Sequence, residues 1–349
     1  MKSIFNLFFY GFAIGFLFIS CSNSEDQYQE IPVSFVKPSN FPDVMYNLDG
    51  YPLTEAGIAL GKELFYEGRL SSDGIISCGF CHIQKDAFTH HGHTFSHGVG
   101  ESIGTRNAPP VQNMAFQNNF MWDGATDDLN ALSLIPISSP IEMNGSLNSI
   151  VQMLNSDAKY RKMFERAFPN KPIDTEHLLK ALGQFMVTMV SSNSKFDKFK
   201  RNESSGTLTT EEFEGYELFN QKCASCHATD LFTDNSFRNN GLQPNPAIND
   251  KGRYNVTNSE TDKYKFKVPS LRNIAKTKPY MHDGRLFTLE AVLDHYDNQV
   301  VDMPTLDPLL RQGTATGIPL TEQEKTKIIA FLKTLTDEDF LNNPKFSEQ

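Results

Sequence analysis

The sequence predicts a mainly α fold composed of two domains of similar plan that are related by an internal duplication. Three observations support this prediction. The pentapeptide Cys-x-x-Cys-His occurs twice, at Cys78–His82 and at Cys223–His227. Residues around these two pentapeptides recur in the same order in both halves, which indicates a duplicated unit. Most other segments have the apolar spacing of helices, few have the alternation of strands, and 349 residues suffice for two cores.

The pentapeptide Cys-x-x-Cys-His is the attachment signal of a c-type haem. Its two cysteines can each form a thioether bond to a haem vinyl group, and the adjacent histidine is then held under the iron. We therefore expect two covalently bound haem c groups in two cytochrome-c-like domains, as in an electron carrier or a redox enzyme. The expected attachment residues are Cys78, Cys81, Cys223 and Cys226, and the expected iron ligands are His82 and His227.

The duplication begins before each haem motif. Gly61-Lys-Glu-Leu-Phe65 precedes the first motif, and Gly215-Tyr-Glu-Leu-Phe219 precedes the second. The second of these segments opens with Thr209-x-x-Glu212, the pattern of a capping box at a helix N-terminus. Each haem motif is therefore expected to follow a short amphipathic helix and a turn.

The repeat continues downstream, where Pro109 to Gly124 matches Pro269 to Gly284 at a constant offset of 160 residues. This pattern predicts an N-terminal haem domain over residues 41–205 and a C-terminal haem domain over residues 206–349. The polar segment 195–207 is expected to be the linker. Further helices are expected at Leu147–Leu154, Tyr160–Phe168, Thr175–Val190, Thr288–Asp297 and Thr321–Thr334.

The N-terminus has the pattern of a lipoprotein-type signal peptide over residues 1–21, followed by a polar tether over residues 22–40. Lys2 precedes an apolar run from Ile4 to Ile19, and Cys21 follows at the expected lipidation position. We expect an exported protein on the periplasmic side or at the cell surface, in contact with the membrane only through a lipid at Cys21. Cleavage by an ordinary signal peptidase is the alternative. Since the other four cysteines belong to haem motifs, no disulfide is expected.

The net charge of −10 argues against nucleic acid as a partner, because proteins that bind nucleic acid are usually basic. An acidic surface would suit a basic electron-donor protein, although solubility alone also explains it.

The chain resembles the bacterial di-haem cytochrome c peroxidase and MauG family over about residues 50 to 335. In that family the N-terminal haem reacts with peroxide and the C-terminal haem relays electrons. The resemblance rests on motifs that occur here in the family's order: Ser77-Cys-x-x-Cys-His82, Arg106-Asn-Ala-Pro109, Trp122-Asp-Gly124, Pro140-Ile-Glu-Met143, Val268-Pro-Ser-Leu-Arg-Asn273, Pro279-Tyr-Met-His-Asp-Gly284 and His295-Tyr-Asp297.

The resemblance places Tyr296 at the distal position of the C-terminal haem. Typical peroxidases of the family have Met there and MauG-like members have Tyr, so this chain is similar to the MauG-like branch. Met281, Met303 and His295 are rival ligands. Independently of the family, Tyr296 lies 14 residues after His282, and the equivalent position, 14 residues after Trp122, is Pro136. Proline has no side-chain donor, so the first haem is expected to keep an open distal site.

The resemblance also implies roles for residues near the haems. Glu142 matches the acid–base residue of the distal pocket, and Trp122 matches the residue that carries electrons between the haems. Leu132 stands where the family often has Gln, which predicts a drier pocket with one fewer hydrogen-bond donor. Asn107, Thr277 and Pro279 match the oxygen ligands of a calcium ion between the domains.

Four histidines, His90, His91, His93 and His97, crowd one loop. Some members of the family close the catalytic haem at rest with a loop histidine, and the matching position here is near Val99, so His97 is the nearest candidate. A solvated loop and a second metal site are the alternatives.

The predicted function is the reduction of hydrogen peroxide at the N-terminal haem, with electrons relayed through the C-terminal haem. The electron donor would be a small cytochrome c or a cupredoxin. One alternative is oxidation of side chains on a partner protein, as MauG does, and another is a non-catalytic di-haem electron carrier. The resemblance also allows a homodimer.

Overall fold

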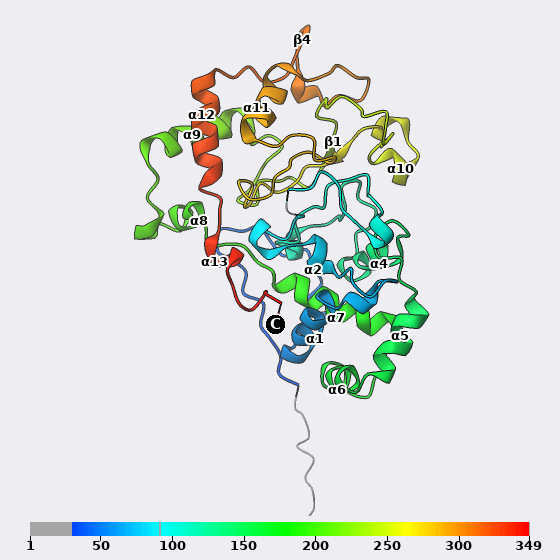
Figure 1. Ribbon diagram of the computed structural model, residues 1–349. Helices are drawn as coiled ribbons and strands as arrows, with labels where there is room; N and C mark the ends of the chain where they lie inside the picture. The colour runs from blue at the N-terminus through cyan, green and yellow to red at the C-terminus, as the bar shows by residue number, and fades with distance from the viewer. Residues whose placement is uncertain (1–29, 91, 349) are drawn as a thin grey trace, which may run out of the picture.

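The computed structural model describes residues 30–90 and 92–348 (Figure 1). The expected signal peptide, the expected lipidation site Cys21 and His91 lie outside the described residues. Within residues 30–90 and 92–348, no helix is long and apolar enough to cross a membrane.

The N-terminal domain is built on the pair α1 (Glu55–Phe65) and α7 (Thr175–Thr188), with α5 (Leu147–Ser156) and α6 (Ala158–Ala167) beside them (Figure 1). Helix α1 begins at Thr54, whose side chain accepts a hydrogen bond from the Gly57 amide. Gly61 lies where α1 and α7 touch, because a Cβ atom there would overlap the Ala181 carbonyl group. The glycine therefore permits a close helix pair that any larger residue would separate.

The C-terminal domain repeats this arrangement with α9 (Thr210–Lys222) packed on α12 (Glu322–Lys333) and with α11 (Leu289–Asn298) beside α12. Capping boxes begin both α9 and α12. Gly215 occupies the place of Gly61, since a Cβ atom there would overlap the Lys327 carbonyl group of α12. The duplicated Gly-x-x-Leu-Phe segments are therefore the faces through which the two helix pairs pack.

The loops of the two domains repeat as well. Asn113 and Asn273 have φ angles of 55° and 58°, and each side-chain oxygen accepts an amide hydrogen bond from the segment after the second helix of its pair. An isolated bridge joins Phe120 to Thr126 and its counterpart joins Tyr280 to Leu286. Backbone conformation thus follows the 160-residue offset of the sequence repeat. The prediction of a mainly α fold with two cytochrome-c-like domains is confirmed.

The remaining regular structure is short. Two antiparallel two-stranded sheets are described, β1 (Phe237–Arg238) with β2 (Phe266–Lys267) and β3 (Arg311–Gln312) with β4 (Ala315–Thr316). The other helices are α2 (Cys78–Cys81), α3 (Leu129–Leu132), α4 (Leu134–Ser138), α8 (Lys195–Lys200), α10 (Tyr254–Thr257) and α13 (Glu338–Leu341). Single 3-10 turns lie at Gly68–Leu70, Gln84–Asp86, Val99–Glu101, Met114–Phe116, Ser204–Gly206, Glu260–Asp262 and Pro308–Leu310.

The segment 195–207 differs from the polar linker that its composition predicts. It begins with α8, which has a complete capping box at Ser194 and Asp197. Asp197 is fully buried and forms a bidentate ion pair with the equally buried Arg272, at 2.5 and 2.7 Å. Its charged residues suggested solvent exposure throughout, whereas one carboxylate is the partner of a buried arginine 75 residues later. The position of the boundary between the domains stays a prediction.

Both ends of the described chain lie along the N-terminal domain (Figure 1). The Val33 amide donates to the Leu53 carbonyl at 2.8 Å. At the other end Phe340 of α13 packs edge-on against Phe88, and the Tyr66 hydroxyl donates to the Phe346 carbonyl at 2.6 Å. The C-terminal tail therefore crosses back from α12 and contributes to the core of the first domain.

Candidate haem and peroxide site

The first haem motif forms helix α2, and His82 follows directly as its C-terminal cap. The Ser77 side chain accepts a hydrogen bond from the Phe80 amide and so fixes the start of the turn. The His82 Nδ1–H group donates to the Phe88 carbonyl at 2.7 Å, since a carbonyl can only accept. Burial lowers the pKa of His82. The imidazole is therefore neutral, with Nε2 left as a free lone pair for a metal.

The second haem motif repeats this geometry. His227 Nδ1–H donates to the Phe232 carbonyl at 2.9 Å, and burial lowers the pKa of this histidine too. None of the four cysteines in the two motifs forms a disulfide. Two free thiols three residues apart, beside an imidazole with one free nitrogen, are the donor set of a c-type haem. These residues fit the cofactor that the sequence predicts.

A cavity of about 450 Å³ opens beside the first motif and is lined by Cys78, Cys81 and His82. Its walls come from both domains and are mainly apolar. Pro136 and Leu132 line it, so the two positions that lack a polar side chain face the space where a haem would bind. The volume is in the ordinary range for cofactor and ligand pockets.

Glu142 lines the same cavity. Burial raises the pKa of its carboxyl group, and a hydrogen bond from the Ser139 side chain partly opposes that rise. The backbone around Glu142 is held firmly, because its carbonyl accepts from the Val99 amide at 2.8 Å and its amide donates to the Ser139 carbonyl at 3.1 Å. The arrangement supplies a positioned carboxyl group that keeps its proton to a higher pH than an exposed glutamate does.

Trp122 also lines the cavity and connects the two domains. Its indole Nε1–H donates to the Asn107 carbonyl at 2.8 Å, within the first domain. Its backbone carbonyl accepts from the Lys267 amide of β2, in the second domain, also at 2.8 Å. The only tryptophan of the chain is therefore fixed on both sides of the domain boundary.

Tyr296 lies on α11 and faces the second haem motif. Burial, followed by smaller electrostatic effects of Cys226 and Cys223, raises the pKa of Tyr296 to about 12. The Asn240 side-chain amide lies 3.5 Å from the Tyr296 hydroxyl and 3.5 Å from the Met281 sulfur. Tyr296 and Met281 therefore converge on one point near the motif, where an adjacent cation would oppose the rise in pKa.

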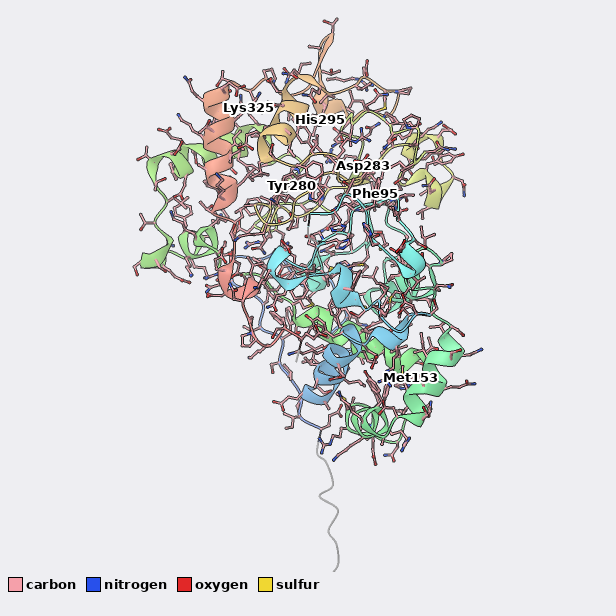
Figure 2. All side chains as sticks on the ribbon, viewed as in Figure 1. Phe95, Met153, Tyr280, Asp283, His295 and Lys325 are labelled. Atoms are coloured by element: carbon pink, nitrogen blue, oxygen red, sulfur yellow. The ribbon has the colours of Figure 1, made fainter. Side chains whose placement is uncertain are left out.

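His295, another candidate ligand, is buried on α11 (Figure 2). Its Nε2 lies 3.1 Å from the Asn240 carbonyl, to which it donates. That nitrogen is thus engaged by the backbone, which favours Tyr296 and Met281 over His295 as donors at this site.

Comparison with known proteins places the chain in a family. The model of the di-haem cytochrome c peroxidase family matches residues 55–205, and that of cytochrome c matches residues 213–336. MauG of Methylorubrum extorquens is 36% identical over 318 residues, which cover 90% of this chain and 87% of that protein. Cytochrome c551 peroxidase of Nitrosomonas europaea is 36% identical over 283 residues and 79% of each chain. The chain belongs to the di-haem cytochrome c peroxidase family.

Solved structures agree with the di-haem cytochrome c peroxidase fold. A MauG-like protein associated with microbial copper homeostasis has a TM-score of 0.80 and 34% identity, over 90% of this chain and 99% of that one. The di-haem peroxidase BthA of Burkholderia thailandensis has a TM-score of 0.71 and 21% identity, over 92% of this chain and 98% of that one. These findings support two haem c sites in two cytochrome-c-type domains.

The loop histidines of this di-haem protein lie close together. His97 lines the cavity, and its Nε2 is 3.0 Å from Nδ1 of His93. The rings of His90 and His93 stack at 4.6 Å between centroids. Over residues 30–90 and 92–348 no three His, Cys, Asp or Glu side chains are arranged to hold a metal ion. A second metal site in this loop and closure of the cavity by His97 both stay predictions.

The residues expected to bind calcium lie at the domain boundary. The Asn107 side-chain amide donates to the carbonyls of His93 and Thr94 at 3.0 and 3.3 Å, and its backbone amide donates to the His282 carbonyl at 2.8 Å. Thr277 is buried, and Pro279 follows a cis peptide bond. Calcium binding by Asn107, Thr277 and Pro279 stays a prediction.

Two cations that sequence reasoning did not single out also line the cavity. Arg106 pairs with Asp123 of its own domain and with Asp250 of the other domain, both at 2.6 Å. Lys267 projects from β2 of the second domain toward the cavity of the first. Arg106 begins one motif of the family resemblance and Lys267 directly precedes another, and these positions could have drawn attention to both residues.

Proposed function

We propose that this di-haem protein reduces hydrogen peroxide at the haem held by Cys78, Cys81 and His82. The overall reaction takes two electrons and two protons and converts one peroxide molecule into two waters. One observation carries the proposal: the cavity beside His82 contains the carboxyl group of Glu142, and Pro136 stands where the other domain has Tyr296. The first site thus combines an acid–base group with a distal position that offers no side-chain donor.

Haem iron supplies the redox chemistry of peroxide cleavage when the cofactor is bound. Glu142 would accept the proton of the incoming peroxide and return it to the departing oxygen. A carboxyl group whose pKa is raised by burial is suited to both transfers, because it is a stronger base than an exposed glutamate and can still return the proton as an acid. Leu132 has no polar group and cannot take part in this proton exchange, so Glu142 would carry it out.

Trp122 would carry oxidising equivalents to the second haem, held by Cys223, Cys226 and His227. The indole N–H donates to a backbone carbonyl, which cannot take up the proton, so loss of an electron from Trp122 would be readily reversed. Tyr296 would be the distal ligand of the second haem. Its hard, anionic oxygen would stabilise the oxidised state of the iron.

Absorption and EPR spectra of the holoprotein, together with peroxide turnover, test this function. We expect one high-spin haem, and peroxide-dependent oxidation of a reduced small cytochrome c or cupredoxin. Tyr296→Phe should change the spectrum of the low-spin haem and leave the high-spin signal in place. Two low-spin haems that bind neither cyanide nor peroxide would contradict the proposal and support a plain electron carrier.

Oxidation of side chains on a partner protein is the second candidate function. It is favoured by Tyr296 and by the 36% identity to a protein named MauG. Each turnover would remove two electrons from the partner's side chain while one peroxide is reduced to two waters. Mass spectrometry of candidate partners after addition of peroxide tests this function, and an unchanged partner mass beside rapid cytochrome oxidation would exclude it for that partner.

We further propose three properties that the resemblance implies. A calcium ion bound through Asn107, Thr277 and Pro279 would fix the position of the two domains relative to each other, and chelation should then alter the haem spectra.

Export and lipidation at Cys21 should place the protein in a membrane fraction, from which Cys21→Ser releases it. Light scattering of the purified holoprotein would distinguish a homodimer from a monomer.

A further inference from the structure

Lys267 brings a positive charge from the second domain into the cavity of the first. It lies on β2, and its side chain lines the same cavity as Cys81 and His82. Its Nζ group donates to the side-chain oxygen of Gln117 at 2.5 Å and to the carbonyl of Asn119 at 2.8 Å. Both acceptors belong to the first domain, so the lysine is held in place across the domain boundary.

The charge of Lys267 is not balanced by its neighbours. Gln117 and Asn119 offer neutral oxygens, and within the described part of the chain no carboxylate forms an ion pair with Lys267. Arg106 of the same cavity, in contrast, has two carboxylate partners. Burial lowers the pKa of Lys267 to about 8. An enclosed ammonium group is costly unless an anion lies beside it.

The hydrogen bonds of Lys267 leave room for such an anion. An ammonium group has three N–H donors, and two of them are used by the first domain. The third remains for a group inside the cavity. A c-type haem carries two propionate carboxylates, so the cofactor that belongs in this cavity brings the missing negative charge with it.

We propose that Lys267 binds a propionate of the haem attached at Cys78 and Cys81, so that the second domain supplies a counter-ion for the cofactor of the first. The contact would be a charge-assisted hydrogen bond, stronger than one between neutral groups. It couples haem binding to domain docking, because the same lysine holds Gln117, Asn119 and the Trp122 carbonyl. The inference depends on the two haems and not on peroxide turnover.

The reduction potentials of both haems in the holoprotein test this proposal, by spectroelectrochemical titration. A cation beside a haem disfavours the more positive ferric state, so Lys267→Met should lower the potential of the high-spin haem more than that of the low-spin haem. Lys267→Arg should retain the wild-type value. Lys263→Met is the matched control, since it removes a lysine of the same segment that is partly exposed and pairs with Glu260.

A near-isosteric variant keeps the test decisive if Lys267→Met does not fold. Gln117→Glu would give Lys267 a carboxylate partner that competes with the propionate, and should also lower the high-spin potential. Potentials that match Lys263→Met in both variants would overturn the proposal. A wild-type potential that depends on phosphate at constant ionic strength, and loses that dependence in Lys267→Met, would overturn it by making the partner a free anion.

Discussion

The protonation of Glu142 is controlled mainly by burial. Burial raises the pKa of this carboxyl group, and the Ser139 side chain alone is a notable opposing influence. The base form, which accepts the peroxide proton, is then lost at a higher pH than for an exposed glutamate, whose pKa is about 4.3. The acidic limb of the rate profile should therefore report Glu142.

Glu142→Gln should slow the reaction with peroxide by about 10²–10⁴-fold, since glutamine cannot exchange a proton. The rate of peroxide reaction should fall in the wild type as the pH drops through the raised pKa of Glu142, and this limb should vanish in the variant. Stopped-flow absorption over a pH series measures both effects. Glu101→Gln, on the exposed loop near the same cavity, is the control and should keep both the rate and the limb.

Ser139 offers a finer test at the same site. Its hydrogen bond lowers the pKa of Glu142, so Ser139→Ala should raise that pKa further and move the acidic limb to higher pH. The neighbouring Ser138→Ala removes a hydroxyl that donates to the Leu134 carbonyl instead and should leave the limb in place. A limb that moves equally in both variants would show that Ser139 acts only through backbone structure.

A residue whose role follows from a local sequence motif can be identified from the sequence. A residue whose role follows from tertiary packing cannot. The haem cysteines and His82 follow a fixed local pattern. The role of Pro136 could be predicted only because the internal duplication aligns this residue with Tyr296. Ser139 and Lys267 each lie directly beside a motif, but the motifs do not show their roles, because these depend on the cavity that distant segments form around them.

Among the helices, α8 shows how a short element stabilises the fold through one buried contact. Its Asp197 pairs with Arg272, and both side chains are fully buried. Burial alone would raise the pKa of Asp197, but Arg272, together with hydrogen bonds from Ser194 and Asn40, holds it below the usual range. The resulting stability is present above the unfolded pKa of about 3.9 and is lost as the pH falls through the lowered folded value.

Asp197→Asn should reduce the free energy of unfolding by about 3–5 kcal/mol, because it leaves the Arg272 charge buried without a partner. Denaturant unfolding of the holoprotein measures the change. Glu260→Gln breaks the exposed pair with Lys263 and should cost no more than about 1 kcal/mol. Equal losses in the two variants would contradict a special role for the buried pair.

The helix pair α9 and α12 depends on the absence of a side chain at Gly215. Gly215→Ala would overlap the Lys327 carbonyl and should destabilise the second domain by about 1–3 kcal/mol. Haem spectra during denaturation should show the low-spin haem affected first, whereas Gly61→Ala should affect the high-spin haem first. Glu217→Ala, at an exposed position of α9, should change stability by less than about 0.5 kcal/mol.

At the scale of the whole molecule, the sequence predicted two similar halves but not how they meet. Helix periodicity and the 160-residue repeat are patterns of nearby or equivalent residues, so they can be recognised in the sequence itself. The interface depends on contacts between distant loops. Near the boundary, Phe95 of the first domain and Asp283 of the second lie close together in Figure 2. A Cβ atom at Gly284 would overlap the backbone of Thr94, so the two domains are in close contact at this point.

Arg106 makes a double ion pair at this boundary, since it joins Asp123 of one domain to Asp250 of the other. Arg106→Gln leaves both carboxylates without their partner and should loosen the docking of the domains. Because a misplacement of about 1 Å can cost about 10²-fold in rate, we expect electron transfer between the haems to slow at least tenfold after flash reduction. Peroxide binding should persist. Arg69→Gln, whose partners Glu67 and Asp157 lie within the first domain, should leave the transfer rate unchanged. Equal rates in both variants would contradict a docking role.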